Sequence, residues 1–380
     1  MTHRSQVHRL PLLVLLLLSL LFFYPILFGQ VLFFGDTLTQ RIPSMVFWKQ
    51  SVLALQPPLW NPYIFAGIPH LADLSTNTLS PFNLAYLLIN NPFTALSWLA
   101  IFEIFTAAAC TYFFLILLKL NRSSSLFGAI VFSFSGTALA AANDINSLQG
   151  IVLIPLIFLM AQRLIHRPSL RNIALLSLSL TLQFISGHPQ YSYYTWVLLA
   201  AYLFAFLPLK LHPKLASIFL TFLLFLGLGS VQLLPFLELS GLTYRPQTLS
   251  FASQNSLQLL DLPRFVLADI YGTWRSGTSW GPASPLETGR ATTEGFVGLF
   301  TLLLSLVALA KARSGLVLFF GLTALFSFTL AFGPANPAFT LARNLLPLFN
   351  NFRSPMRLLA IYTFALAPLA AHGFNSLTKK

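Results

Sequence analysis

The stretch FTALSWLAIFEIFTAAACTYFFLILL, residues 93–118, decides the fold class of this chain. At 1.5 Å per residue an α-helix of this length exceeds the roughly 30 Å of hydrocarbon in a bilayer, and Glu103 is its one charged residue. We therefore predict an all-α polytopic integral membrane protein with about ten transmembrane helices, forming a single domain over residues 1–380. The other expected spans are 10–28, 125–142, 148–164, 172–186, 191–209, 215–236, 294–310, 315–332 and 355–373.

Composition excludes a soluble domain. Hydrophobic residues make up 56% of the chain and charged residues 8%, with a mean hydropathy of +0.75, whereas soluble domains carry about a quarter charged residues. The net charge of +13 is dispersed in ones and twos, so no nucleic-acid partner is expected. Cys110 is the single cysteine, and CxxC and HExxH motifs are absent. No cofactor is indicated, and a requirement for a divalent metal stays open.

The N-terminal apolar run, Leu10 to Phe28, follows several basic residues. It ends in bulky side chains and has no small-x-small cleavage site, so we expect a retained first span rather than a cleaved signal peptide.

The short connections between the expected spans alternate in charge. One set is basic and free of acids, which marks the cytoplasmic side by the positive-inside rule. We therefore expect a multi-pass protein of the cell (plasma) membrane with both termini cytoplasmic. The long outer loops would be 29–92 and 237–293. The basic set comprises Arg4, Arg9, Lys119, Arg122, Arg163, Arg167, Arg171, Lys210, Lys214, Lys311, Arg313, Lys379 and Lys380.

The expected outer face holds nearly all the acids and is also rich in arginine. Planar guanidinium groups suit phosphate and carboxylate recognition, although lipid headgroups or the outer acids would serve them equally well as partners. The outer arginines are Arg41, Arg245, Arg264, Arg275, Arg290, Arg343, Arg353 and Arg357.

The first outer loop places a carboxylate where the chain leaves the membrane. Asp36 follows Gly35 directly after the first span, and Asp73 is a second acid in the same loop. Between Ile42 and Leu55 one helical face is apolar, which predicts a short helix lying in the membrane interface. The residues of this face are Ile42, Met45, Val46, Val52 and Leu53. A carboxylate at this boundary suits a general base that deprotonates an acceptor hydroxyl while a sugar leaves a lipid-linked phosphate. The simpler alternative is a solvated surface acid.

Six motifs along the chain resemble those of one family. They closely resemble segments of the YfhO-like bacterial membrane proteins and occur in the same order; those proteins are relatives of the polytopic GT-C glycosyltransferases. The motifs are GDTLTQRIP at 35–43, PPLWNPYIFAGIPHLAD at 57–73, LSPFNL at 79–84, SGHPQYSYY at 186–194, ELSGLTYRPQ at 238–247 and NNFRSPMRLLAIYTFALAPLAAHGF at 350–374.

The resemblance implies a membrane glycosyltransferase that transfers a sugar from a polyprenyl-phosphate carrier to an extracytoplasmic glycan, lipid or protein. It implies Asp36 as the catalytic residue, because GT-C enzymes use an acid of the first outer loop. Other residues in the matching motifs become candidates for substrate binding. They are Gln40, Arg41, Trp60, Asn61, Asp73, His188, Gln190, Arg245, Arg353 and Arg357.

Two alternatives remain at this stage. A transporter or flippase for a lipid-linked sugar would be expected to show internal repeats and several intramembrane charges, and only Glu103 lies clearly within a span. The second alternative is a non-catalytic subunit of a cell-envelope glycosylation system. YfhO-like proteins are usually much longer, so three interpretations stay open: a short variant, a truncated gene product, or the partner of a second polypeptide that supplies further spans.

Overall fold

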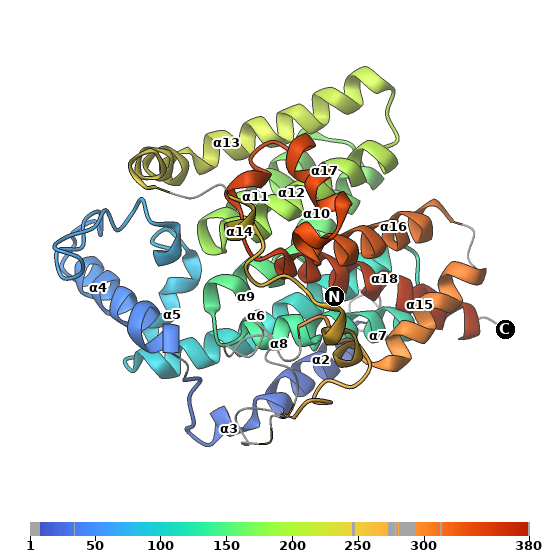
Figure 1. Ribbon diagram of the computed structural model, residues 1–380, viewed down its shortest axis with the longest axis horizontal. Coiled ribbons are helices and arrows are strands. Elements are labelled where there is room, and N and C mark those ends of the chain that lie inside the picture. Colours follow the sequence, from blue (N-terminus) through green and yellow to red (C-terminus); the bar gives the residue numbers. More distant parts are fainter. Residues whose placement is uncertain are drawn as a thin grey trace. The chain divides into compact units, whose positions relative to one another are not determined.

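The computed structural model describes residues 8–33, 35–244, 248–272, 278, 280, 294–311 and 314–378. Over these residues every named element is a helix (Figure 1), and the pairing of Asn61 with Ile68 is an isolated β-bridge. The expected all-α class is confirmed.

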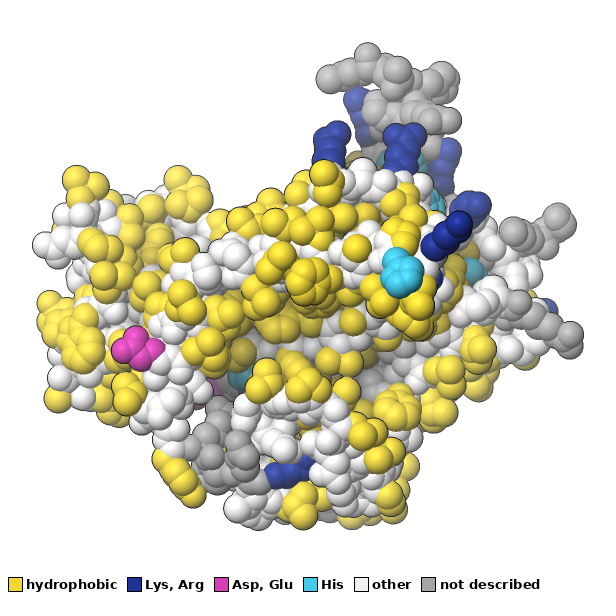
Figure 2. Space-filling view, turned by 90° about the horizontal axis from the view of Figure 1, so that it is seen from above, with side chains coloured by type: hydrophobic (Ala, Val, Ile, Leu, Met, Phe, Trp, Pro, Cys, Tyr) yellow, Lys and Arg dark blue, Asp and Glu magenta, His cyan; other side chains and the backbone are white. Residues whose placement is uncertain are grey.

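Several helices are apolar enough to lie in a membrane. Four also have the length to cross it: α6 (Pro92–Leu117), the pair α9 and α10 (Ile145–Val152 and Ile154–His166), α13 (Leu211–Leu242), and η9 with α18 (Pro355–Leu358 and Leu359–Thr378). Shorter apolar helices are α2 (Arg9–Phe22), α11 (Leu170–Ser186), α15 (Leu299–Lys311) and α16 (Gly315–Leu330). Hydrophobic side chains cover much of the face drawn in Figure 2. These features indicate a helical multi-pass membrane protein, and the count of ten spans stays a prediction.

Contacts divide the chain into two compact units. The first consists of Met1–Cys110 and Ala142–Tyr244. Its further helices are α3 (Tyr24–Leu27), the π-helical turn η1 (Thr37–Arg41), α4 (Ile42–Leu53), η2 (Leu74–Thr76), η3 (Pro81–Asn83), α5 (Leu84–Leu88) and α12 (Pro189–Phe206). Helices α11 and α13 pack closely. Their contact includes a 2.9 Å hydrogen bond from the Ser177 hydroxyl to the Thr221 carbonyl and an edge-to-face pair of Phe184 and Phe225.

The second unit consists of Thr111–Ala141 and Arg245–Lys380. Helix α18 is its core, because it is buried along most of its length and packs against α7, α15 and α16. Small residues permit this close approach: a Cβ atom at Gly373 would lie 2.0 Å from the carbonyl oxygen of Leu304. The remaining elements are α7 (Arg122–Ser133), α8 (Gly136–Ala141), α14 (Leu249–Ala252), η4 (Leu259–Phe265), η7 (Gly333–Ala335), α17 (Pro337–Leu345) and η8 (Phe349–Asn351).

Three expected spans are interrupted in the structure. The segment 10–28 divides into α2 and α3 just before Pro25, and 148–164 divides at Leu153 just before Pro155. Proline lacks an N–H and disfavours helical backbone in the preceding residue, so each new helix starts with proline near its first turn. The segment 125–142 divides between α7 and α8.

The helix expected over 42–55 is present as α4, but its faces differ from the expectation. Ile42 and Met45 are buried together with Trp48, whereas Val46 and Leu53 are exposed. The π-helical turn before α4 adds backbone to one helical turn, and the sequence pattern gave no sign of it.

Candidate functional site

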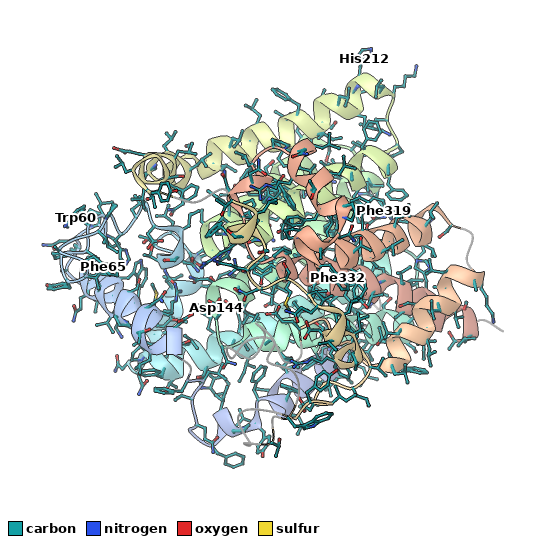
Figure 3. All side chains as sticks on the ribbon, in the orientation of Figure 1. Trp60, Phe65, Asp144, His212, Phe319 and Phe332 are labelled. Atoms are coloured by element: carbon teal, nitrogen blue, oxygen red, sulfur yellow. The ribbon has the colours of Figure 1, made fainter. Side chains whose placement is uncertain are left out.

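Asp36 lies at the start of the π-helical turn η1, and its side chain is exposed. The adjacent Thr37 is buried, and its hydroxyl donates a 2.7 Å hydrogen bond to the carbonyl of Asn143. Asn143 precedes Asp144, which is the N-cap residue of α9 and is labelled in Figure 3. The turn thus presents the Asp36 carboxylate outward while the next residue fastens the backbone to the segment leading into α9.

Arg41, at the other end of the same turn, points into the protein. It is 6% exposed, and its Nη1 donates to the Thr76 carbonyl at 3.0 Å and to Asn146 Oδ1 at 3.4 Å. Its Nη2 donates to Asn83 Oδ1 at 3.1 Å, and its guanidinium lies 5.9 Å from the ring centroid of Tyr86. Arg41 therefore anchors the first loop to the helical bundle.

A chain of side-chain amides continues from Arg41 toward Glu103 in α6. The Nδ2 atom of Asn77 donates to Asn146 Oδ1 at 2.8 Å and to Gln149 Oε1 at 2.9 Å. Gln149 Nε2 then donates to Glu103 Oε1 at 2.7 Å. Asn77 has φ of 50°, a left-handed conformation that asparagine adopts more readily than most residues. We call Arg41, Asn77, Asn146, Gln149 and Glu103 the polar core.

The polar core includes buried atoms that the described residues leave without a hydrogen-bond partner. They are Arg41 Nε, Asn77 Oδ1 and Glu103 Oε2. A buried polar atom left unpaired costs about 1–3 kcal/mol, so these atoms favour a bound water or a polar ligand group as a further partner. The atoms belong to a guanidinium, an amide and a carboxyl group.

His70 is a site residue that sequence reasoning missed. It is fully buried, with Nε2 3.0 Å from the Ser44 hydroxyl and Nδ1 3.0 Å from the Thr78 hydroxyl. Burial lowers the pKa of His70 to about 4, against an opposing effect of the nearby Asp73 carboxylate. The imidazole is thus neutral near pH 7, and it ties α4 to the loop that carries Thr76 and Thr78.

The Gly-His-Pro-Gln turn joins the same structure. His188 caps α12, because its Nδ1 accepts a 3.2 Å hydrogen bond from the backbone N–H of Gln190. The backbone N–H of His188 donates to the Asn146 carbonyl at 2.9 Å. Gln190 is buried and donates to the Tyr194 hydroxyl at 2.7 Å. The structure therefore brings Arg41 and His188 together through Asn146.

The other predicted residues of the first loop have local contacts. Gln40 is exposed, and the ring of Trp60, also exposed, covers Gly67. Asn61 is buried and accepts a 3.0 Å hydrogen bond from the N–H of Tyr63. Asp73 caps η2 by accepting from the Ser75 N–H at 2.8 Å.

Arg245 lies outside the described residues. Arg353 and Arg357 belong to the second unit. Arg353 is exposed, donates to Gln254 Oε1 at 3.1 Å and lies 5.6 Å from the ring centroid of Phe251.

Within the described ranges, no three His, Cys, Asp or Glu side chains gather closely enough to hold a metal ion. Asp36 and Asp73, the two acids of the first loop, instead occupy an exposed turn and a helix cap.

Comparison of the chain with protein-family models, curated proteins and solved structures finds no match. The function must therefore be argued from the site itself.

Proposed function

We propose that this chain is a membrane glycosyltransferase of the GT-C type, resembling the YfhO-like proteins, with about ten spans in the cell membrane. It transfers a sugar from a polyprenyl-phosphate carrier to an extracytoplasmic glycan, lipid or protein. The observation that carries the proposal is the contrast within one helical turn. Asp36 is exposed at its start, while Arg41 at its end is buried and held by three oxygen atoms. A general base needs a fixed position and access to its substrate, and this turn supplies both.

In the proposed reaction Asp36 accepts the proton of an acceptor hydroxyl. The hydroxyl oxygen forms a bond to the anomeric carbon as the bond from that carbon to the phosphate oxygen breaks, and the polyprenyl phosphate departs with the electron pair. The terminal nitrogens of Arg41 already serve Thr76, Asn83 and Asn146. Its role in the proposal is therefore to position the turn.

The test compares two carboxylate-to-amide variants in proteoliposomes. The substrates are a panel of radiolabelled polyprenyl-phosphate hexoses, with solubilised cell-envelope material as the acceptor. We expect the wild type to release the carrier phosphate and Asp36→Asn to lose at least 100-fold in rate, the lower range for removal of a general base. The control, Glu238→Gln, removes an exposed carboxylate from α13 and should retain activity. Full transfer by Asp36→Asn would remove Asp36 as the base.

A second candidate function follows from Glu103. An acid within a helix long enough to span a membrane, linked to a buried arginine by amides, is also a feature of transport pathways. Passage of a lipid-linked sugar across vesicles without transfer to an acceptor, abolished by Glu103→Gln but not by Asp36→Asn, would favour a transporter. Activity that appears only with a second polypeptide would favour the subunit.

A further inference from the structure

The first loop carries an exposed apolar surface that the reaction proposed for Asp36 does not use. Leu55 is 93% exposed, Phe65 90% and Tyr63 80%. We call residues 53–66 the aromatic tip. In Figure 3 the labelled Trp60 and Phe65 lie apart from the labelled Asp144, the N-cap residue of α9. The other exposed apolar residues of the tip are Leu53, Leu59 and Trp60.

The tip is held in a defined shape. Asn61 and Ile68 exchange two backbone hydrogen bonds of 2.9 Å, so the segment between them forms a closed loop. Gly67, with φ of 112°, lies beneath the Trp60 ring, and a Cβ atom there would come within 2.5 Å of that ring. Phe65 has a left-handed φ of 51°, a conformation that costs energy in a bulky residue. Fixed exposure of large apolar side chains indicates a surface that meets an apolar partner.

The connection to α13 indicates the depth of the tip. Gln232 is buried, and its Nε2 donates to the carbonyl of Leu71, whose own N–H donates to the Leu59 carbonyl at 3.2 Å. Helix α13 carries no charged residue between Lys214 and Glu238. Gln232 is six residues before Glu238, or about 9 Å along the helix. The base of the tip therefore lies beside the charge-free part of a candidate span.

The chemistry of the tip fits lipid better than water. The chain has no charged residue between Lys49 and Asp73, and tryptophan and tyrosine both occur in the tip. These two residues favour the boundary between lipid headgroups and hydrocarbon. Prolines at 57, 58, 62 and 69 have no backbone N–H to leave unpaired in a medium with little water.

We propose that the aromatic tip inserts into the lipid leaflet next to the Glu238 end of α13, with phospholipid as its partner. The first loop is then fastened at three places: to the polar core through Arg41, to α13 through Gln232, and to the membrane through the tip. The inference is independent of the glycosyltransferase proposal and of which side of the membrane the loop faces.

The test uses the single cysteine of the chain. In a Cys110→Ala background, Phe65→Cys is labelled with an environment-sensitive nitrobenzoxadiazole probe and reconstituted into phosphatidylcholine–phosphatidylglycerol vesicles. The matched control is Ser75→Cys, an exposed position of the same loop outside the tip. Leu55→Cys is a second tip position that protects the test against a misfolded Phe65 variant.

We expect the tip probes to be quenched by lipids with a nitroxide near the headgroup and to be at least threefold less sensitive than position 75 to iodide on both sides of the membrane. Equal iodide quenching at tip and control positions would overturn the proposal. Protection of the tip probes from both quenchers would also overturn it, since that result indicates a protein partner.

Discussion

At the residue scale, the polar core joins the Arg41 guanidinium to the Glu103 carboxyl group through amides instead of a direct ion pair. Along the path from Arg41 to Glu103, Asn146 accepts from both of its neighbours and Asn77 donates to both of its neighbours. Gln149 accepts from Asn77 and donates to Glu103. Removing one end leaves buried partners without a hydrogen bond, and the loss of a buried charged partner costs roughly 3–5 kcal/mol.

We therefore predict that Arg41→Ala lowers the free energy of unfolding by roughly 3–5 kcal/mol. Glu103→Gln should cost less, because its amide oxygen can still accept the 2.7 Å hydrogen bond from Gln149. The measurement is unfolding of the purified protein in mixed micelles, with the double variant completing the cycle. Additive effects of the two changes would contradict coupling between these residues.

His70 gives the protein a dependence of stability on pH. Its folded pKa of about 4 lies below the ordinary 6.5, so between these values the unfolded chain binds more protons than the folded one. The stability contributed by the neutral imidazole is complete above pH 6.5, falls as the pH drops toward 4, and then changes no further.

We expect the unfolding midpoint to fall as the pH drops from 6.5 to 4, and His70→Asn to flatten that part of the profile. The variant should also be less stable at neutral pH, because Ser44 and Thr78 cannot both keep their present hydrogen bonds. An unchanged pH profile in His70→Asn would assign the effect to other groups.

Individual residues show what the sequence could and could not predict. The position of Asp36 after an apolar run indicated an exposed acid, and its side chain is exposed. The direction of Arg41 was not predictable, because nothing local distinguishes an arginine facing substrate from one held by Asn83 and Asn146. Those partners are 42 and 105 positions away along the chain. Such contacts form only when the loop packs on the helices.

At the element scale, the π-helical turn Thr37–Arg41 relates the exposed acid to the buried arginine. Deletion of the exposed Leu38 should convert it to an α-helical turn. Because each residue of an α-helix turns about 100°, Asp36 would then face a different direction while α4 keeps its packing. We predict loss of transfer together with a loss of roughly 1 kcal/mol in stability, because Thr37 also turns away from the Asn143 carbonyl. Normal transfer by the deletion variant would exclude a role for the turn.

Close helix packing in the second unit leads to a further prediction, in which two glycines serve as a matched pair. A Cβ atom at Gly373 in α18 would overlap the Leu304 carbonyl, whereas one at Gly227 in α13 would meet nothing within 4 Å. Gly373→Ala should therefore destabilise the protein by about 1–3 kcal/mol through overpacking. Gly227→Ala should be neutral or stabilise it by up to about 1 kcal/mol through helix propensity. Equal melting temperatures for the two variants in detergent would refute this packing.

Element boundaries followed local chemistry only in part. The hydrophobic pattern located helices in all the expected spans, and the breaks before Pro25 and Pro155 follow from proline. The length of α13 was underestimated, since 215–236 was expected and Leu211–Leu242 is helical. Lys214 and Glu238 lie near the two ends of this helix. They end the apolar run from which the span was predicted, but a charged residue does not end a helix.

At the scale of the whole molecule, charge alternation remains the basis for orientation. The polar core, the Gly-His-Pro-Gln turn and the first loop contact one another, in keeping with their expected location on one side. The same helices and contacts fit this orientation and its inverse equally well. The positive-inside rule distinguishes the two because it concerns how the chain inserts into the membrane and not how the helices pack.

We predict that cysteines at expected outer positions react with a membrane-impermeant maleimide in intact cells, and that those at expected inner positions react only after permeabilisation. In the Cys110→Ala background, exposed outer positions are Ser75 and Ser253, and exposed inner positions are Ser123 and Leu211. The inner pair flanks basic connections that contain Lys119, Arg122, Lys210 and Lys214. Moving such clusters across the membrane is unfavourable, which predicts that they stay on the cytoplasmic side. Labelling of Ser123→Cys in intact cells together with protection of Ser75→Cys would place Asp36 in the cytoplasm, where an extracytoplasmic acceptor cannot reach it.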